Sequence, residues 1–200
     1  MKYKAALWIG QGVLLSVIPF ASCLAEAGGV KSIGVAVEGV NHLGPNHSIS
    51  PFYIDKSAFG NVNRGGGSGT ICCVTIPEKW RPGLVVEVRW GVANWSNEIR
   101  EEIKIGNYRS VVDEGVYKAI VPIEEYEEPM NLFVHFFPGG KIRVLTSQYS
   151  QNSEKHPVVK GDDNAATMAT KGVKIRKIFS EKELRDLIEY NKERMRKFKG

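Results

Sequence analysis

The chain has 200 residues, of which 42% are hydrophobic and 24% charged, with 21 Gly and three Cys. This composition is typical of a single folded domain, and it excludes a disordered chain, a coiled coil and a disulfide-rich scaffold. The net charge of +5 is concentrated at one end, because residues 171–200 hold 11 of the 27 Lys and Arg but only five of the 22 Asp and Glu. The near-neutral remainder argues against a body that binds nucleic acid, whereas the basic tail suits an acidic partner or an anionic membrane.

Residues 1–27 are typical of a secretory signal peptide. Lys2 and Lys4 give a short basic start, and the uncharged stretch 5–20 is shorter than the roughly 20 apolar residues that span a bilayer. The sequence is compatible with two alternative cleavage sites. Cleavage after Ala27 suits ordinary signal peptidase, whereas the segment ending in Cys23 resembles a bacterial lipobox, in which case the signal peptide ends at residue 22 and Cys23 carries lipid. Both routes predict export to the periplasm, with the protein either soluble or lipid-anchored to a membrane.

Between residues 30 and 157 the apolar side chains recur with a period of two, which predicts β-strands. The alternation is clear in 33–37, 84–90 and 116–121. Segments 131–137 and 141–147 are expected to pair as a hairpin through Pro138-Gly139-Gly140. Both faces of 131–137 are apolar, which favours a central strand. We therefore predict a mainly β domain over residues 30–157, built as an antiparallel β-sandwich or a partly open barrel.

Two charged features of this domain are candidates for binding a partner. The glycine-rich loop 60–70 carries Arg64 as its only charge and lacks the Lys of a phosphate-binding Walker loop, so it is either a plain loop or an anion nest of backbone N–H groups. The second feature is an acidic run: Glu124, Glu125, Tyr126, Glu127 and Glu128. This run is either a solvated turn or a docking patch for a basic partner.

Cys72 and Cys73 are adjacent in an apolar segment and would lie in an oxidising compartment after export. Neighbouring side chains on a regular strand point to opposite faces, so a bond between these two would need a distorted peptide. We expect no such bond, and instead two small apolar strand residues with at least one in the core.

No metal site, cofactor site or catalytic set can be nominated. His42 and His47 share one loop, whereas His135 and His156 are distant in sequence, and no Cys-x-x-Cys or His-x-His pair accompanies them. We expect these histidines to be individually satisfied or exposed. A nucleophile elbow around Ser68 fails because Thr70 stands where the last Gly belongs. The sequence therefore predicts that the protein is not an enzyme.

The end of the chain combines a polar segment with one helix. Residues 151–172 are polar and lack a sustained apolar period, so they are expected to be a linker or an ordered but irregular excursion, and the linker between domain and helix is assigned to residues 158–179. A helix is predicted over 180–198, since Ser180 and Glu183 form a capping box with Phe179 and Leu184 at the staple positions. Its apolar stripe comprises Leu184, Leu187, Ile188, Met195 and Phe198. The stripe either packs back onto the sheet or faces a partner.

Four groups of motifs between residues 33 and 157 carry a resemblance to a known family. They are Val37-Glu38-Gly39-Val40-Asn41-His42; Gly65-Gly66-Gly67 with Cys72-Cys73-Val74; Ile76-Pro77-Glu78-Lys79-Trp80-Arg81-Pro82-Gly83-Leu84 with Val88-Arg89-Trp90; and Val134-His135-Phe136-Phe137-Pro138-Gly139-Gly140. Together they resemble a family of exported bacterial proteins, many of them lipoproteins. Some members are immunity proteins that neutralise lipase effectors of the type VI secretion system.

The resemblance implies that the chain binds one cognate phospholipase or lipase effector and needs no chemistry of its own. A periplasmic envelope lipoprotein with a structural or ligand-binding role is the alternative. The sequence departs from the family pattern in two places, because Phe20 stands in the lipobox where Leu is usual and a basic helix follows Gly172.

Overall fold

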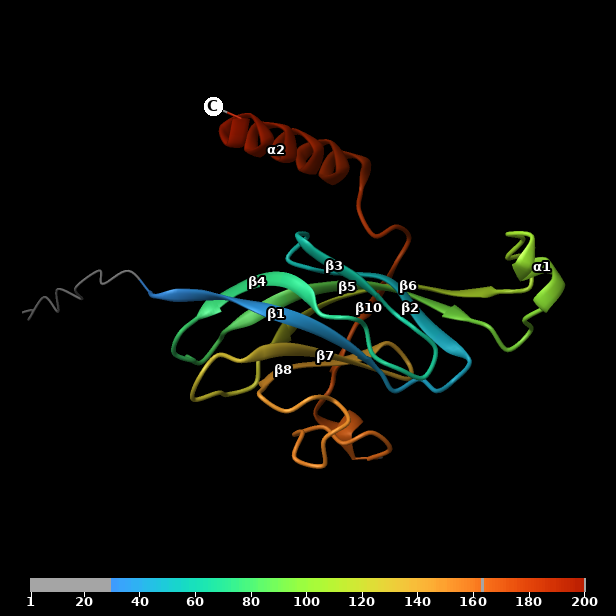
Figure 1. The fold of residues 1–200 in the computed structure, drawn as a ribbon, viewed down its shortest axis with the longest axis horizontal. Helices are drawn as coiled ribbons and strands as arrows, with labels where there is room; N and C mark the ends of the chain where they lie inside the picture. Colours follow the sequence, from blue (N-terminus) through green and yellow to red (C-terminus); the bar gives the residue numbers. More distant parts are fainter. Residues whose placement is uncertain (1–29, 163, 200) are drawn as a thin grey trace, which may run out of the picture.

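The computed structural model describes residues 30–162 and 164–199, so the predicted signal peptide and Cys23 lie outside the described residues. Ten strands in this part of the chain form two five-stranded sheets (Figure 1). Sheet A has the order β4 (Ile71–Pro77), β1 (Ser32–Asn41), β7 (Asn131–Phe137), β8 (Lys141–Ser147) and β9 (Thr170–Lys171). Sheet B has the order β10 (Val173–Ile175), β6 (Val112–Pro122), β5 (Val85–Asn94), β2 (His47–Ile54) and β3 (Ala58–Val62). The helical elements are α1 (Arg100–Lys104), the 3₁₀ helix η1 (Ala165–Met168) and α2 (Glu181–Lys199).

The predicted fold class, a mainly β sandwich-like protein with a C-terminal helix, is confirmed. The hairpin of β7 and β8 pairs from Asn131 with Ser147 to Phe137 with Lys141, as expected. β7 is also a central strand, because β1 covers its other edge. The pairing of β1 with β7 is parallel, with Val37 opposite Leu132. The other named strand pairs of the described residues are antiparallel, as predicted.

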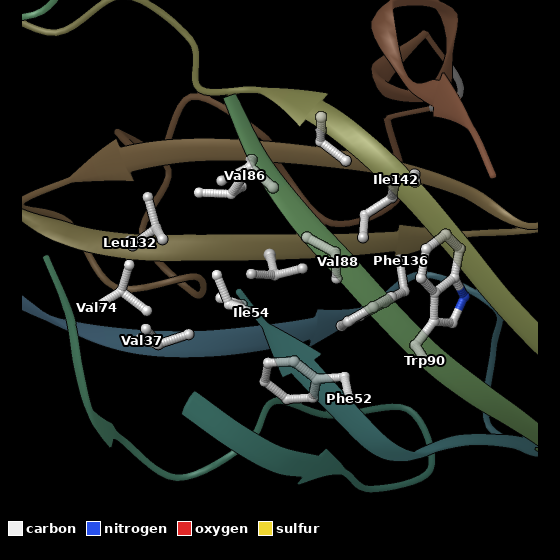
Figure 2. Close-up of a cluster of buried hydrophobic side chains, with 14 of the residues drawn as sticks. Val37, Phe52, Ile54, Val74, Val86, Val88, Trp90, Leu132, Phe136 and Ile142 are labelled. Carbon is white, nitrogen blue, oxygen red and sulfur yellow. The ribbon is translucent and has the colours of Figure 1, made fainter. Parts of the chain in front are cut away.

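The main core lies between the two sheets, where the inward-facing side chains of both interdigitate (Figure 2). Trp90 of sheet B and Phe136 of sheet A contact each other across this core, with ring centroids 5.9 Å apart. Phe52 meets Phe136 edge-on at 5.3 Å. Figure 2 labels ten of these residues: Val37, Phe52, Ile54, Val74, Val86, Val88, Trp90, Leu132, Phe136 and Ile142. The period of two in the sequence thus corresponds to one face of each strand turned toward the opposite sheet.

A second, smaller core covers the outer face of sheet A. Its buried residues are Val40, Phe133, Phe137, Leu145, Val158 and Ala165. The last two come from the segment 148–169, which lies under β7 and β8 in Figure 1. Beyond it, β9 pairs with β8 and β10 pairs with β6, so the chain crosses from one sheet to the other near Gly172. Within residues 158–179 the structure places η1, β9 and β10, with irregular segments between them.

Cys72 and Cys73 form a disulfide with each other, so the prediction of no bond is wrong. The peptide between them is cis, which places both side chains on one side of the chain, whereas the prediction assumed the alternation of a regular strand. Both residues are exposed, so the expectation that one of them lies in the core is wrong as well.

The C-terminal helix begins with the predicted capping box. The Ser180 backbone N–H donates to Glu183 Oε2 (2.9 Å), and the Glu183 N–H donates to Ser180 Oγ (3.2 Å). Phe179 is buried and contacts Tyr53 edge-on at 4.7 Å. After this first turn, α2 lies apart from both sheets, and its apolar residues Leu184, Ile188 and Met195 are exposed (Figure 1). None of the described helices combines the length and apolar character needed to cross a membrane.

Candidate functional site

Arg64 lies at a cleft of about 580 Å³ that the sequence alone could not outline. β2 and the end of β3 form one wall, and the excursion between β5 and β6, which contains α1, forms the other. Polar and aromatic side chains dominate the lining: Ser48, Ser50, Asn61, Asn63, Arg64, Trp95 and Tyr108. Because loops far apart in sequence converge here, the cleft is a property of the fold and not of one motif.

The Arg64 guanidinium is held in place by two neighbours. It donates to the Glu98 carboxylate, and its central carbon lies 5.1 Å from the centroid of the Trp95 ring. Trp95 is fixed in turn, because its Nε1–H donates to Ser48 Oγ at 2.8 Å and its ring meets Tyr108 edge-on at 6.2 Å. The ion pair and the ring contact together restrict the Arg64 side chain to one position. Its side chain is still 42% exposed.

Apolar side chains are exposed on the same excursion. Ile105 is 81% and Tyr108 57% exposed, and Ile99 is exposed as well. One carboxylate oxygen of Glu102, also in this excursion, is buried without a hydrogen-bond partner among the described residues. We call Arg64, Trp95, Ile99, Ile105 and Tyr108 the Arg64 surface. Arg, Trp and Tyr on a fixed scaffold with apolar neighbours are the composition typical of protein-binding hot spots.

The acidic run is divided by the structure into inward-facing and outward-facing residues. Glu124 accepts two hydrogen bonds from Arg143, at 2.7 and 2.9 Å, and Tyr126 donates its hydroxyl hydrogen to the Pro77 carbonyl at 2.6 Å. These two residues therefore stabilise the body. The remaining three, Glu125, Glu127 and Glu128, are exposed.

Arg64 and the acidic run lie at opposite ends of sheet A. The acidic run precedes the first residue of β7, whereas the glycine loop contacts the last residue of β1, where the Asn41 N–H donates to the Gly66 carbonyl (3.1 Å). β1 and β7 are parallel, so both strands end at the same edge of the sheet. The start of β7 therefore lies toward the opposite edge from the last residue of β1. The predicted partner-binding residues thus occupy two separate places.

Sequence analysis missed a chain of three histidines on the outer face of sheet A. His42 Nε2 lies 2.9 Å from His135 Nδ1, and His135 Nε2 lies 3.2 Å from His156 Nε2. His156 Nδ1 lies 2.9 Å from the Tyr149 carbonyl oxygen. The alternation of β7 places His135 on the same face as Phe133 and Phe137. Its partners could not be found from sequence, because they depend on the parallel pairing of β1 and on the irregular segment 148–169.

The surroundings of this histidine chain favour uncharged imidazoles. Burial, reinforced by the positive charge of Lys160, lowers the pKa of His42 to about 4. Burial also places the pKa of His135 well below its usual range, and it lowers that of His156 against the opposing effect of the Tyr149 carbonyl. His47 is separate and pairs with Glu114 at 3.2 Å. Within residues 30–162 and 164–199, no group of three or more His, Cys, Asp or Glu is arranged to hold a metal ion.

These features define a small two-sheet β-protein with an ordered excursion over one face, a protruding helix and a preorganised polar and aromatic cleft. A family model described as a protein of unknown function (DUF3304) matches residues 40–144, just over half of the chain, and the chain belongs to this family. The matched residues run from the end of β1 into β8 and include Arg64, Trp95, Tyr108, His42 and His135. No curated protein and no solved structure matches the chain.

Proposed function

We propose that this protein is an immunity protein that binds a cognate phospholipase or lipase effector of a type VI secretion system and neutralises it in the periplasm. The observation that carries the proposal is the Arg64 surface, in which Trp95 contacts both Arg64 and Tyr108 and the excursion that holds Trp95 and Tyr108 also exposes Ile99 and Ile105. The class of partner is inferred from the resemblance of the sequence motifs to exported immunity proteins. Inhibition by this route is binding alone, so the protein has no turnover and needs no cofactor.

The Arg64 surface suits this task because its groups are already positioned. Binding costs free energy for every side chain that must be immobilised, and fixed aromatic and guanidinium groups reduce that cost. Arg64 remains partly solvated in the free protein, so a partner carboxylate can approach it while the Trp95 contact is kept. The exposed side chains of Ile99 and Ile105 would lose their contact with water on binding. We therefore place the main contact with the effector at this surface.

The helix α2 supplies a second, weaker contact. Its last eight residues, 192–199, include five Lys or Arg and one Glu. Such a basic segment attracts an acidic surface, and salt screens the attraction of solvent-exposed charges such as those of Lys192, Arg196 and Lys197. We therefore assign α2 a smaller and salt-sensitive share of the binding free energy, with the sheet body carrying most of it.

Export is part of the proposal, because the inhibitor must share a compartment with the toxin. The predicted signal peptide supports this, with either a soluble mature form beginning at Gly28 or a form lipidated at Cys23. Globomycin separates these two routes. Accumulation of precursor, together with release from membranes by Cys23→Ala, would establish the lipid anchor, whereas mature protein beginning at Gly28 would establish the soluble form.

The deciding experiment begins with the neighbouring genes, among which the proposal expects one that encodes a lipase-like effector. The purified proteins should form a complex, and lipase activity should fall in proportion to the amount of inhibitor added, with no substrate consumed by the inhibitor itself. Cells that receive the toxin in the periplasm should survive with the full-length protein and die when residues 1–27 are deleted. No complex at micromolar concentration, where binding of about −8 kcal/mol is measurable, would refute the proposal in favour of an envelope lipoprotein.

A further inference from the structure

The three histidines form a hydrogen-bond chain with one defined direction. At its inner end the Tyr149 carbonyl only accepts, so His156 Nδ1 carries the hydrogen and donates it. A neutral His156 then has a lone pair on Nε2, which accepts from His135 Nε2–H. His135 Nδ1 accepts in turn from His42 Nε2–H. Protonating His135 at Nδ1 or His156 at Nε2 would set two donors against each other across one of these contacts. Protonation of His42 is instead disfavoured by its burial and by the positive charge of Lys160.

This direction fixes the chemistry of the outermost nitrogen. A neutral His42 that donates from Nε2 has a lone pair on Nδ1. No hydrogen bond to this atom is formed by any of the residues that the structure describes. Stacking of the ring on Phe137, with centroids 4.6 Å apart, holds it in one orientation. The chain thus ends in a hydrogen-bond acceptor that has no partner within the described protein.

His42 lines a pocket of about 430 Å³ at the end of sheet A. Lys141 and Lys160 line the same pocket, as does Asp162. Lys160 is close enough to His42 for its charge to act on the ring, and it also donates to the Gly65 carbonyl. Apolar surface is contributed by Phe137, Pro138 and Ala166. The pocket therefore combines an unused acceptor, two cationic side chains and apolar walls.

We propose that this pocket binds a small carboxylate that carries a hydroxyl group close to its charged end. The hydroxyl donates to His42 Nδ1, the carboxylate pairs with Lys160, and the carbon skeleton lies against Phe137. Asp162 in the same lining disfavours dianions such as phosphate monoesters, because like charges repel at short range. A carboxylate without the hydroxyl would leave the His42 acceptor unpaired. This site shares no lining residue with the cleft at Arg64, although Lys160 contacts Gly65 next to Arg64, and the proposal does not depend on effector binding.

The test is a titration of ¹⁵N-histidine-labelled protein, followed by NMR, with three probes of matched size. D-gluconate has both groups, hexanoate has only the carboxylate, and glucose has only hydroxyls. In the free protein we expect neutral His42 and His135 with the hydrogen on Nε2, and neutral His156 with the hydrogen on Nδ1. Gluconate should shift the His42 Nδ1 resonance in a saturable way at millimolar concentration, at least about tenfold more tightly than hexanoate or glucose.

Two variants assign the contacts. Lys160→Gln changes an exposed side chain and should weaken gluconate binding about tenfold without changing the fold. His42→Phe keeps an aromatic ring against Phe137 but removes the acceptor, so gluconate and hexanoate should then bind equally. His47→Gln is the control, because His47 lies outside this pocket. Gluconate binding no tighter than hexanoate binding, no saturable shift of His42, or equal affinity of Lys160→Gln and the unchanged protein would each overturn the proposal.

Discussion

Arg89 on β5 holds Glu183, in the first turn of α2, through two hydrogen bonds. Arg89 Nη2 lies 2.7 Å from Glu183 Oε1, and Nη1 lies 3.1 Å from Oε2. Arg89 is only 5% exposed and also donates to the Ile178 carbonyl at 2.6 Å. These contacts, with that of Ser180, hold the pKa of Glu183 well below its usual range. One carboxylate therefore both caps the helix and anchors it to sheet B.

Replacing Glu183 with Gln should loosen α2 while leaving the two sheets intact. The variant loses the charged half of the Arg89 pair and weakens the cap, but Arg89 keeps Glu87 at 2.7 Å. We expect a cost of about 1–3 kcal/mol, confined to the helix. Hydrogen exchange should therefore accelerate in 180–190 and remain unchanged in β5. Glu189→Gln, an exposed change on the same helix, is the control, and equal exchange in both variants would contradict the anchor.

Glu124 and its neighbour Glu125 should differ sharply in their effect on stability. Arg143, which is 8% exposed, donates to Glu124 and to the Ala165 carbonyl, so the pair joins β8 to the segment 148–169. Glu124→Gln leaves a buried guanidinium with a weaker partner and should lower the free energy of unfolding by about 2 kcal/mol or more. Glu125→Gln should change it by less than about 0.5 kcal/mol. Urea unfolding of both variants measures the difference, and similar midpoints would mean that the buried pair contributes little.

Local patterns were sufficient to predict the β-class, the hairpin of β7 and β8, and the capping box at Ser180, because neighbours in sequence determine each of them. The parallel contact of β1 with β7 was not predictable, since it depends on how distant strands meet. The bond between Cys72 and Cys73 joins two adjacent residues, which the alternation of side chains on a regular strand does not predict.

The candidate sites likewise contain some features that follow from neighbouring residues and others that depend on contacts between distant segments. Arg64 was nominated as a partner-binding residue because it is the single charge in a glycine loop, and that role stays a prediction. The contact of Trp95 with Arg64 depends on the excursion between β5 and β6, which the sequence does not reveal. The acidic run was treated as one unit, but the inward turn of Glu124 depends on Arg143 in the next hairpin. The three histidines come from three distant segments, and their positions form no recognisable sequence motif.

The free energy of unfolding should decrease as the pH falls from about 6.5 toward 4. His42 takes up a proton near pH 6.5 when unfolded but only near pH 4 when folded, so the unfolded state binds more protons between these values. The pKa of folded His42 is lowered by burial and by the nearby charges of Lys160, His156 and Arg143. The slope should reach at most about 1.4 kcal/mol per pH unit for each histidine of the chain.

Urea unfolding between about pH 7.5 and 5 measures this slope apart from Glu183, whose lowered pKa affects stability only in more acidic solution. His42→Phe should reduce the slope, because one titrating ring is removed. His47→Gln should retain it, since His47 lies outside the histidine chain. A flat profile in the unchanged protein would show that the buried rings do not resist protonation.

Binding of the effector should depend on the Arg64 surface more than on α2 or the acidic run. Arg64→Ala and Tyr108→Ala should each weaken the complex by about 2 kcal/mol, roughly thirtyfold, because each removes a fixed group at the centre of the proposed interface. Both side chains are substantially exposed, so the fold should be retained, which thermal unfolding checks. Removal of residues 180–200 should weaken effector binding by less than either substitution does, and this loss should be measurable only at low salt. Glu127→Gln, at the far end of sheet A, should leave the affinity unchanged. Calorimetric titration of each variant into the effector at two salt concentrations decides the matter, and full affinity in the Arg64 and Tyr108 variants would place the interface elsewhere on the protein.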